Sequence, residues 1–359
     1  MKSNFKTNHV KILYIFFITL SLNIFFFSTE KLEGKAFDIK EIDVSRPFEI
    51  NFDKNDVIDE GFKKAFIELI SSTISSSDQK KIKHTKLNKI KGIVESFTIR
   101  EEKFIDDIYF LNLGVSFNRK KYFNYLENKN IFPSIPIRKK FFFLPLIIDE
   151  SKNDLLIFNN NKLIQLWNNK QKNHQLIEYI LPSEDLEDIN LIKKNYETLE
   201  KYDFKEIVKK YDLENSIIAL IFKNKNEIRI LSRITIKDQT TLKNKSFTNT
   251  SIENDTKIEN LISNLKIIYE DLWKQSNQIN TSIRLALNIK ASNTNNSKIS
   301  NFEKILAEND LVYDFFISKF NKDFTYYQII YNSTPDIFLK DMSDKDYSFN
   351  TQNKVWILK

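Results

Sequence analysis

Residues 141–145 read Phe-Phe-Phe-Leu-Pro, an apolar run from which the fold of the surrounding chain can be inferred. Four large apolar residues in succession are typical of a strand that is buried on both faces. Proline has no N–H to donate to a neighbouring strand, so we expect this strand to end near Pro145. The run therefore predicts a fully buried strand at the centre of a unit.

Helix and strand patterns alternate in the segments that follow. Residues 163–167 have the apolar spacing of a short helix, and residues 176–181 have the composition of a strand. A capping-box spacing that begins at Asp203 predicts another helix. Residues 216–236 then alternate as in a hairpin. This order is typical of a compact α/β unit.

The segment before Pro133 has the pattern of a separate unit. Apolar side chains recur at helical spacing between residues 57 and 74. Between residues 111 and 117 they alternate with polar ones, as in a half-buried strand. Residues 37–132 are therefore expected to form a small α+β domain, which ends where Pro133 and Pro136 interrupt the chain.

The last third of the chain predicts a linker, a long helix and a final unit. Residues 237–255 are polar, which predicts a linker at the end of an α/β domain that spans residues 133–255. An amphipathic helix follows from Thr256, and after it the patterns occur in the order βαββαβ of the ferredoxin-like split unit. We expect residues 256–359 to form that helix and a ferredoxin-like domain. The predicted fold class is thus mixed α+β and α/β, in several small units.

Residues 1–36 have the pattern of an export signal. Three lysines precede an apolar run at residues 12–27, and a positive start followed by a core of this length is typical of a secretory signal peptide. A membrane span usually needs about 20 apolar residues, so an uncleaved anchor is the alternative, with membrane contact through residues 12–27. The segment predicts export to a bacterial periplasm, either as a free protein or anchored to the inner membrane.

The charge of the chain does not favour nucleic-acid binding. The net charge is +7, but five lysines and two glutamates within residues 1–36 account for +3 of it. The short basic runs at residues 80–83 and 138–140 lack interleaved aromatic residues, so solvated surface is the simpler interpretation. We therefore expect no nucleic-acid partner.

Few residues in the chain suit catalysis or a cofactor. There is no cysteine, and therefore no disulfide, thiolate metal site or cysteine nucleophile. The three histidines, His9, His84 and His174, lie in the signal segment or in polar surroundings. With 4 glycines in the chain a phosphate-binding loop is difficult to build. These features predict a protein that is not an enzyme and carries no cofactor or metal.

One acidic cluster is the candidate site. It contains Glu184, Asp185, Glu187 and Asp188, in a turn that follows a predicted strand. Such a cluster can bind a hard cation or supply part of a carboxylate pair for hydrolysis. It can also simply begin a helix, because acidic residues stabilise a helix N-terminus. Helix initiation is the favoured interpretation, and the others stay open.

Several of these patterns together resemble an uncharacterised proteobacterial periplasmic family that is known only as a domain of unknown function. The resemblance rests on a strand that ends in Phe143-Leu144-Pro145, a helix with Trp167, and Leu181-Pro182 before the turn Leu186-Glu187-Asp188. A helix that ends in Tyr211 completes it. The middle domain is also similar in layout to the N-terminal domain of the Tol-system propeller protein TolB and to lipoprotein activators of peptidoglycan synthases. The resemblance implies a periplasmic, non-enzymatic, partner-binding role.

The favoured hypothesis is therefore a non-catalytic accessory or scaffold protein that contacts other envelope proteins. Two alternatives remain. One is an envelope hydrolase that uses carboxylates near Glu184–Asp188, and the other is a binding protein held to the membrane by residues 12–27.

Overall fold

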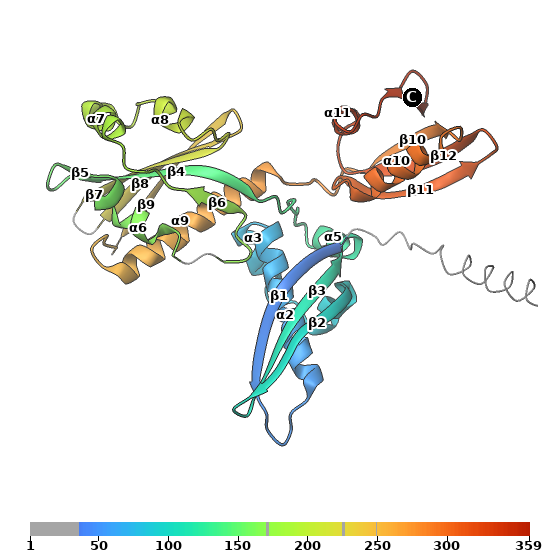
Figure 1. Cartoon of the computed structure of the whole chain (residues 1–359), viewed down its shortest axis with the longest axis horizontal. Helices are drawn as coiled ribbons and strands as arrows, with labels where there is room; N and C mark the ends of the chain where they lie inside the picture. The colour runs from blue at the N-terminus through green and yellow to red at the C-terminus, as the bar shows by residue number, and fades with distance from the viewer. Residues whose placement is uncertain (1–35, 170–171, 225–226, 249) are drawn as a thin grey trace, which may run out of the picture.

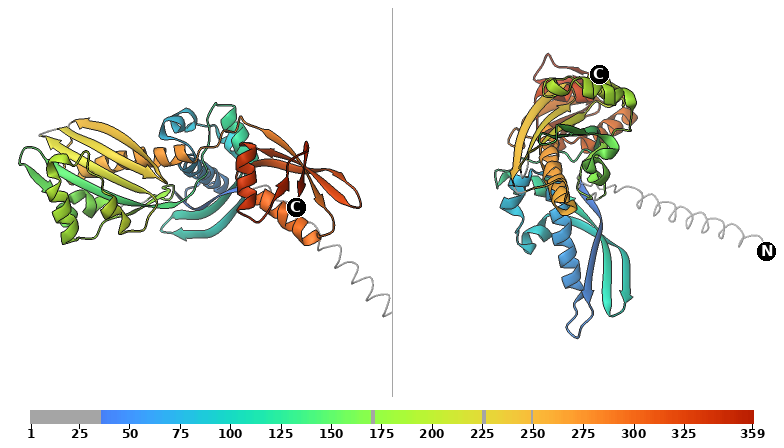
Figure 2. Two further views of the ribbon diagram at one scale, coloured as in Figure 1. Left: turned by 90° about the horizontal axis from the view of Figure 1, so that it is seen from above. Right: turned by 90° about the vertical axis from the view of Figure 1, so that its left-hand side faces the viewer.

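A computed structural model describes residues 36–169, 172–224, 227–248 and 250–359. Within these ranges the chain forms three sheets, each with its own helices. We call the three parts the N-terminal unit (residues 36–131), the middle unit (residues 139–276) and the C-terminal unit (residues 285–358). The middle and C-terminal units lie on opposite sides of the N-terminal unit (Figures 1 and 2). The predicted mixed α+β class is confirmed.

The predicted signal or anchor segment lies almost entirely outside the described residues, since the description begins at Ala36. In the ranges that the structure describes, no helix has the length and apolar character needed to cross a membrane.

The N-terminal unit is an antiparallel three-stranded sheet with helices against one face. Its elements are β1 (Ala36–Pro47), α2 (Lys54–Thr73), α3 (Ser76–Ile82), α4 (Leu87–Ile93), β2 (Val94–Ile105), β3 (Ile108–Asn118) and α5 (Arg119–Glu127). The strand order is β1-β3-β2. The helix predicted at residues 57–74 and the strand predicted at residues 111–117 are confirmed as α2 and β3. Gly61 lets α2 approach the sheet closely, because a Cβ there would collide with Leu113.

The middle unit is a mixed sheet with helices on both faces. Its strands are β4 (Lys139–Asp149), β5 (Asp154–Leu156), β6 (Ile177–Ile180), β7 (Ser216–Asn224), β8 (Glu227–Ile236) and β9 (Gln239–Thr248). Its helices are α6 (Lys162–Trp167), α7 (Leu186–Lys194), α8 (Lys205–Lys209) and α9 (Asp255–Ser276), with 3-10 turns at Phe158–Asn160 and Tyr196–Thr198. The strand order is β5-β4-β7-β8-β9, and β6 pairs with β4.

Phe141–Leu144 form the predicted strand that is buried on both faces. Phe141 and Phe143 point toward α6 and α9, whereas Phe142 and Leu144 point toward α7 and α8. The predicted end at Pro145 is wrong, because β4 continues to Asp149. On the side opposite β7, β6 pairs with β4 only up to Phe142 and β5 begins to pair at Ile147. Pro145 lies in the gap between them, where its carbonyl accepts a hydrogen bond from Asn161 Nδ2 and no strand needs its missing N–H.

The predicted linker at residues 237–255 is instead mostly a strand. β9 pairs with β8 along all ten of its residues without a register shift. Polar residues are compatible with this strand because it is the outermost of the sheet and nearly all its side chains are exposed. The long helix, α9, also differs from expectation: its apolar stripe packs on the middle sheet rather than in the C-terminal unit.

The C-terminal unit has the predicted βαββ start and a different end. Its elements are β10 (Leu285–Ser292), α10 (Asn296–Glu308), β11 (Val312–Phe320), β12 (Phe324–Tyr331), α11 (Pro335–Ser343), β13 (Phe349–Asn350) and β14 (Val355–Leu358). The strand order is β11-β12-β10-β14-β13. A ferredoxin-like unit has one strand after its second helix. Here β13 comes first, and the chain then turns back so that β14 pairs in parallel with β10.

Candidate functional site

The four residues of the predicted acidic site lie at the start of α7. Asp185 is the N-cap of this helix and accepts a hydrogen bond from Glu187 N at 2.8 Å. Three carboxylates share one ammonium: Lys210 Nζ lies 3.0 Å from Asp185 Oδ2, 3.1 Å from Glu187 Oε2 and 2.7 Å from Asp188 Oδ1. Glu184 lies apart from this group and accepts a hydrogen bond from Asn159.

This arrangement is suited to starting a helix and to binding Lys210. The hydrogen bond from Lys210 lowers the pKa of Asp185, and the three carboxylates raise the pKa of Lys210. A general acid needs the opposite shift, a carboxyl group whose pKa is raised. Among the residues that the structure describes, no group of three or more potential ligands is arranged to hold a metal ion. Asp188 Oδ2 is buried without a hydrogen-bond partner in this part of the chain.

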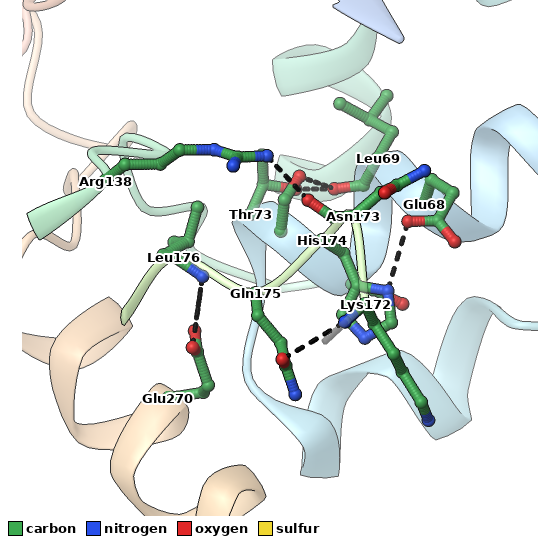
Figure 3. A network of polar contacts seen from close by, with 12 residues as sticks. Glu68, Leu69, Thr73, Arg138, Lys172, Asn173, His174, Gln175, Leu176 and Glu270 are labelled. Carbon is green, nitrogen blue, oxygen red and sulfur yellow. Dashed lines mark hydrogen bonds and ion pairs between the residues drawn. The ribbon is translucent and has the colours of Figure 1, made fainter. Parts of the chain in front are cut away.

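Neither His84 nor His174, the two histidines within the described ranges, has a polar contact with the acidic cluster. His9 lies outside the described residues, and His84 is exposed on the surface. His174 is half-buried, and its Nδ1 lies 3.0 Å from Glu68 Oε2 of α2. The pair therefore connects the middle unit to the N-terminal unit (Figure 3).

Polar contacts that surround His174 form a joint between these two units. Arg138 Nη2 donates to the carbonyl of Asn173 at 2.8 Å, and the loop that contains both Asn173 and His174 lies against α2 (Figure 3). Between the units, Ser134 N donates to the carbonyl of Thr73 at 2.6 Å. The loop therefore bonds to the N-terminal helix directly and to the segment that joins the units.

The last two turns of α9 provide the buried part of the joint. Glu270 is 6% exposed, and its carboxylate accepts hydrogen bonds from Leu176 N at 3.0 Å and Ile177 N at 2.9 Å. Burial raises the pKa of Glu270, although the two backbone N–H groups oppose that shift. Burial lowers the pKa of Lys274, whose Nζ donates to the carbonyl of Ser71 at 2.5 Å.

Two further residues of α9 extend these contacts. Asp271 accepts hydrogen bonds from Ser76 N at 2.8 Å and Ser76 Oγ at 2.5 Å. Trp273 Nε1 donates to the carbonyl of Ile137 at 2.7 Å. Buried polar groups that are fully hydrogen-bonded hold their elements in one arrangement. The joint therefore fixes α9 against the N-terminal unit.

A groove runs beside this joint, between α9 and the edge strand β9. One part is a cavity of about 500 Å³, and a second part of about 660 Å³ continues it along the helix. Both parts are lined by Lys243 of β9 and by Leu272 and Gln275 of α9. We call this the β9–α9 groove; its other lining residues include Ile74, Ser75, Ser77, Ile234, Ile236, Lys245 and Ile268.

The groove combines an apolar floor with a strand edge that carries lysines and regularly spaced backbone groups. Ile268 and Leu272 contribute the floor, and Lys243 and Lys245 are exposed along β9. Neither lysine has an ion-pair partner within the described ranges. In the part of the chain that the structure describes, the backbone of β9 has one neighbouring strand, β8, so its other edge can still form hydrogen bonds. This geometry can hold an extended polypeptide that carries acidic side chains.

Sequence reasoning missed the residues of the joint and the groove. A signal for the joint exists, since Lys266, Glu270 and Lys274 recur every four residues on the same side of α9 as its apolar stripe. Charged residues at such positions must be buried with partners. The groove gives a weaker signal, namely the alternation of Thr241, Lys243 and Lys245 within the supposed linker.

No protein-family model matches the chain, and no curated protein matches it.

Proposed function

We propose that this chain is an exported, non-catalytic accessory protein of the cell envelope that works through contacts with other envelope proteins. The observation that carries the proposal is the β9–α9 groove, with its unbroken strand edge and unpaired lysines. Export rests on the pattern of residues 1–36.

The groove receives an extended segment of a partner by strand addition. Backbone groups of the segment pair with the free edge of β9, which has ten regularly spaced residues. Apolar side chains of the segment reach Ile268 and Leu272, while acidic ones reach Lys243 and Lys245. The joint supports this mode because it holds α9 and residues 73–77 in place before the partner arrives, which reduces the entropy lost on binding.

The hydrolase alternative has less support. Asp185, Glu187 and Asp188 already have Lys210 as a shared counter-ion, and the pKa of Asp185 is lowered rather than raised. The anchored alternative concerns residues 12–27, and mass spectrometry of the N-terminus of the protein from cells distinguishes it from a cleaved form.

Site-specific photo-crosslinking in living cells tests the proposal. A photoreactive residue at Gln275, which lines both parts of the groove, should crosslink reproducibly to one envelope protein. The matched control is Asn264, an exposed residue on the same helix that lines neither part. Crosslinks of equal yield and identity from both positions would contradict the proposal, as would a complete lack of crosslinks from Gln275.

Charge reversal shows whether the lysines take part. The double variant Lys243→Glu, Lys245→Glu should lose most of the crosslink from Gln275, because it replaces attraction for acidic side chains by repulsion. The double variant Lys193→Glu, Lys194→Glu makes the same charge change on α7 and should keep the crosslink. Equal losses in the two variants would show that only the net charge matters.

A further inference from the structure

The sheet of the C-terminal unit has one face that its helices leave open. Apolar residues of α10 and α11 pack on the other face, where they contact Leu287, Ile289 and Ile329. Residues that directly oppose each other on antiparallel strands lie on the same face of a sheet. The register of β10, β12 and β11 therefore defines the open face residue by residue.

Two adjacent rows of side chains lie at the centre of this face, between the row of Ala286, Ile330 and Asp314 and the pair of Ser292 and Phe324. In the first row Lys290, Tyr326 and Lys319 are opposed across the three strands, so that the central residue is aromatic and the two outer ones are lysines. In the second row Asn288, Gln328 and Phe316 are opposed in the same way. We call these six residues the open face. Phe316 is 47% exposed, so its ring is accessible to a ligand on this face.

The amines of the open face pair with rings instead of carboxylates. Lys290 Nζ lies 4.9 Å from the centre of the Phe324 ring, and Lys319 Nζ lies 5.5 Å from the centre of the Tyr326 ring. Neither lysine forms an ion pair with a carboxylate of the described ranges, and neither row contains an acidic residue. Asp314, at the end of the face, already pairs with Lys120 of α5 at 2.5 Å. The open face is thus cationic and without an internal counter-ion.

We propose that the open face binds an acidic polysaccharide, a glycan strand whose sugars carry carboxylates. The rings of Tyr326 and Phe316 contact the apolar faces of sugars, and the amides of Asn288 and Gln328 bond to hydroxyl groups. Lys290 and Lys319 bind the carboxylates. The proposal does not depend on the β9–α9 groove, which lies in a different unit.

The spacing of the lysines decides between an acidic glycan and a nucleic acid. Lys290 and Lys319 are two strands apart, which is about 10 Å. Two lysines separated by an aromatic residue fit a glycan chain in which only some of the sugars carry a charge. Single-stranded nucleic acid carries a phosphate on every nucleotide and is bound by a continuous cationic track. The open face has only these two amines, so the glycan is favoured.

Calorimetric titration of the full chain tests this assignment. The probes are a uronate oligomer, in which β-1,4-linked uronic acids alternate with neutral sugars, a neutral β-1,4-linked glucose oligomer of equal length, and oligouridylate. We expect the uronate oligomer to bind at least about tenfold more tightly than either of the other probes, since each charge-assisted pair adds to the affinity. Equal affinity for the neutral oligomer, or tighter binding of oligouridylate, would overturn the proposal.

Matched variants locate the binding on the open face. The double variant Lys290→Gln, Lys319→Gln should weaken uronate binding by about tenfold or more. The double variant Lys304→Gln, Lys345→Gln removes two exposed amines elsewhere in the unit and should have no effect. Phe316→Ser should weaken binding, whereas Ile317→Ser, at the next and similarly exposed position of β11, should not. Similar effects within either pair would overturn the proposal, and thermal melting confirms that all variants fold.

Discussion

The two faces of the middle sheet hold carboxylates in opposite ways. On one face, Glu270 of α9 is buried at the joint and is bonded to the N–H groups of Leu176 and Ile177. On the other face, Asp185 and Glu187 are exposed at the start of α7 and share Lys210 with Asp188. The first carboxylate connects segments that are 93 or more residues apart in sequence, and the second group stabilises the end of one helix.

The difference shows that the carboxylate most important for the structure can be a single buried residue, here Glu270, rather than a member of an acidic cluster. Removal from water raises the pKa of Glu270, because the charged form loses hydration. A neighbouring ammonium lowers the pKa of Asp185, because the charged form gains a partner. The lone acid on an apolar helix face is therefore the group whose loss should matter most, and the cluster should tolerate change.

Replacement of Glu270 should give the largest effect. Glu270→Leu leaves two buried N–H groups without an acceptor, and each such donor costs about 1–3 kcal/mol. Relief from burying the carboxylate offsets part of this cost, so we expect the free energy of unfolding to fall by about 3 kcal/mol. Urea unfolding measures it. Asn264→Ala, on the exposed side of the same helix, is the control and should change stability by less than about 0.5 kcal/mol. Equal values for the two variants would show that the joint does not stabilise the protein.

The pH dependence of stability should depend on Glu270 in a defined direction. Its pKa is raised from 4.5 in the folded protein, so the folded state binds a proton more tightly than the unfolded state does. The stability that this group contributes is complete below pH 4.5 and is lost as the pH rises through the folded pKa. The two backbone N–H groups and the charge of Lys274 reduce the shift without reversing it.

Glu270→Gln isolates this contribution. The amide oxygen can still accept hydrogen bonds from the backbone, but the side chain no longer titrates. The melting temperature of the unmodified protein, measured relative to that of Glu270→Gln, should fall as the pH increases from below 4.5 to neutrality. A difference that stays constant, or that grows with pH, would contradict the raised pKa.

Asp188 should have an intermediate effect. Its side chain is nearly fully buried, and Asp188 Oδ1 lies 2.7 Å from Lys210 Nζ. Asp188→Ala removes that contact while Asp185 and Glu187 still neutralise the lysine, so we expect a loss of about 1–2 kcal/mol in urea unfolding. Asn190→Ala, an exposed position on the same helix, is the control. If Asp188→Ala lowered the free energy of unfolding as much as Glu270→Leu does, the two faces of the sheet would not differ in how much their carboxylates contribute to stability.

Elements whose burial leaves a regular apolar pattern in the sequence were predictable, whereas elements with neither face buried, or with an unexpected face buried, were not. The α2 helix was predictable because its apolar residues recur at helical spacing, and the β4 strand because an unbroken apolar run is typical of a strand buried on both faces. β9 was not, because an outermost strand with both faces exposed needs no apolar alternation. The start of α7 was predictable from its acids, whereas the partner Lys210 was not, because it comes from another segment of the chain. The open face depends on register across three strands, which no local pattern reveals.

Asp185 should give the smallest effect, and its pH dependence should have the opposite sign to that of Glu270. Asp185→Asn keeps a side-chain oxygen that can cap α7, since asparagine and aspartate are similar N-caps. It loses only the charge that pairs with Lys210, at an exposed site where ion pairs contribute little.

The pKa of Asp185 is lowered from 3.8, so its contribution is present above that pH and is lost as the pH falls through the folded pKa. The melting temperature of Asp185→Asn should therefore lie slightly below that of the unmodified protein at neutral pH, and the gap should close in acid. Glu206→Gln, which removes an exposed carboxylate of α8 outside the cluster, is the matched control and should leave the melting temperature at neutral pH unchanged. A gap for Asp185→Asn that widens in acid would mean that Lys210 does not stabilise the charged form, and the two faces of the sheet would then treat their carboxylates alike.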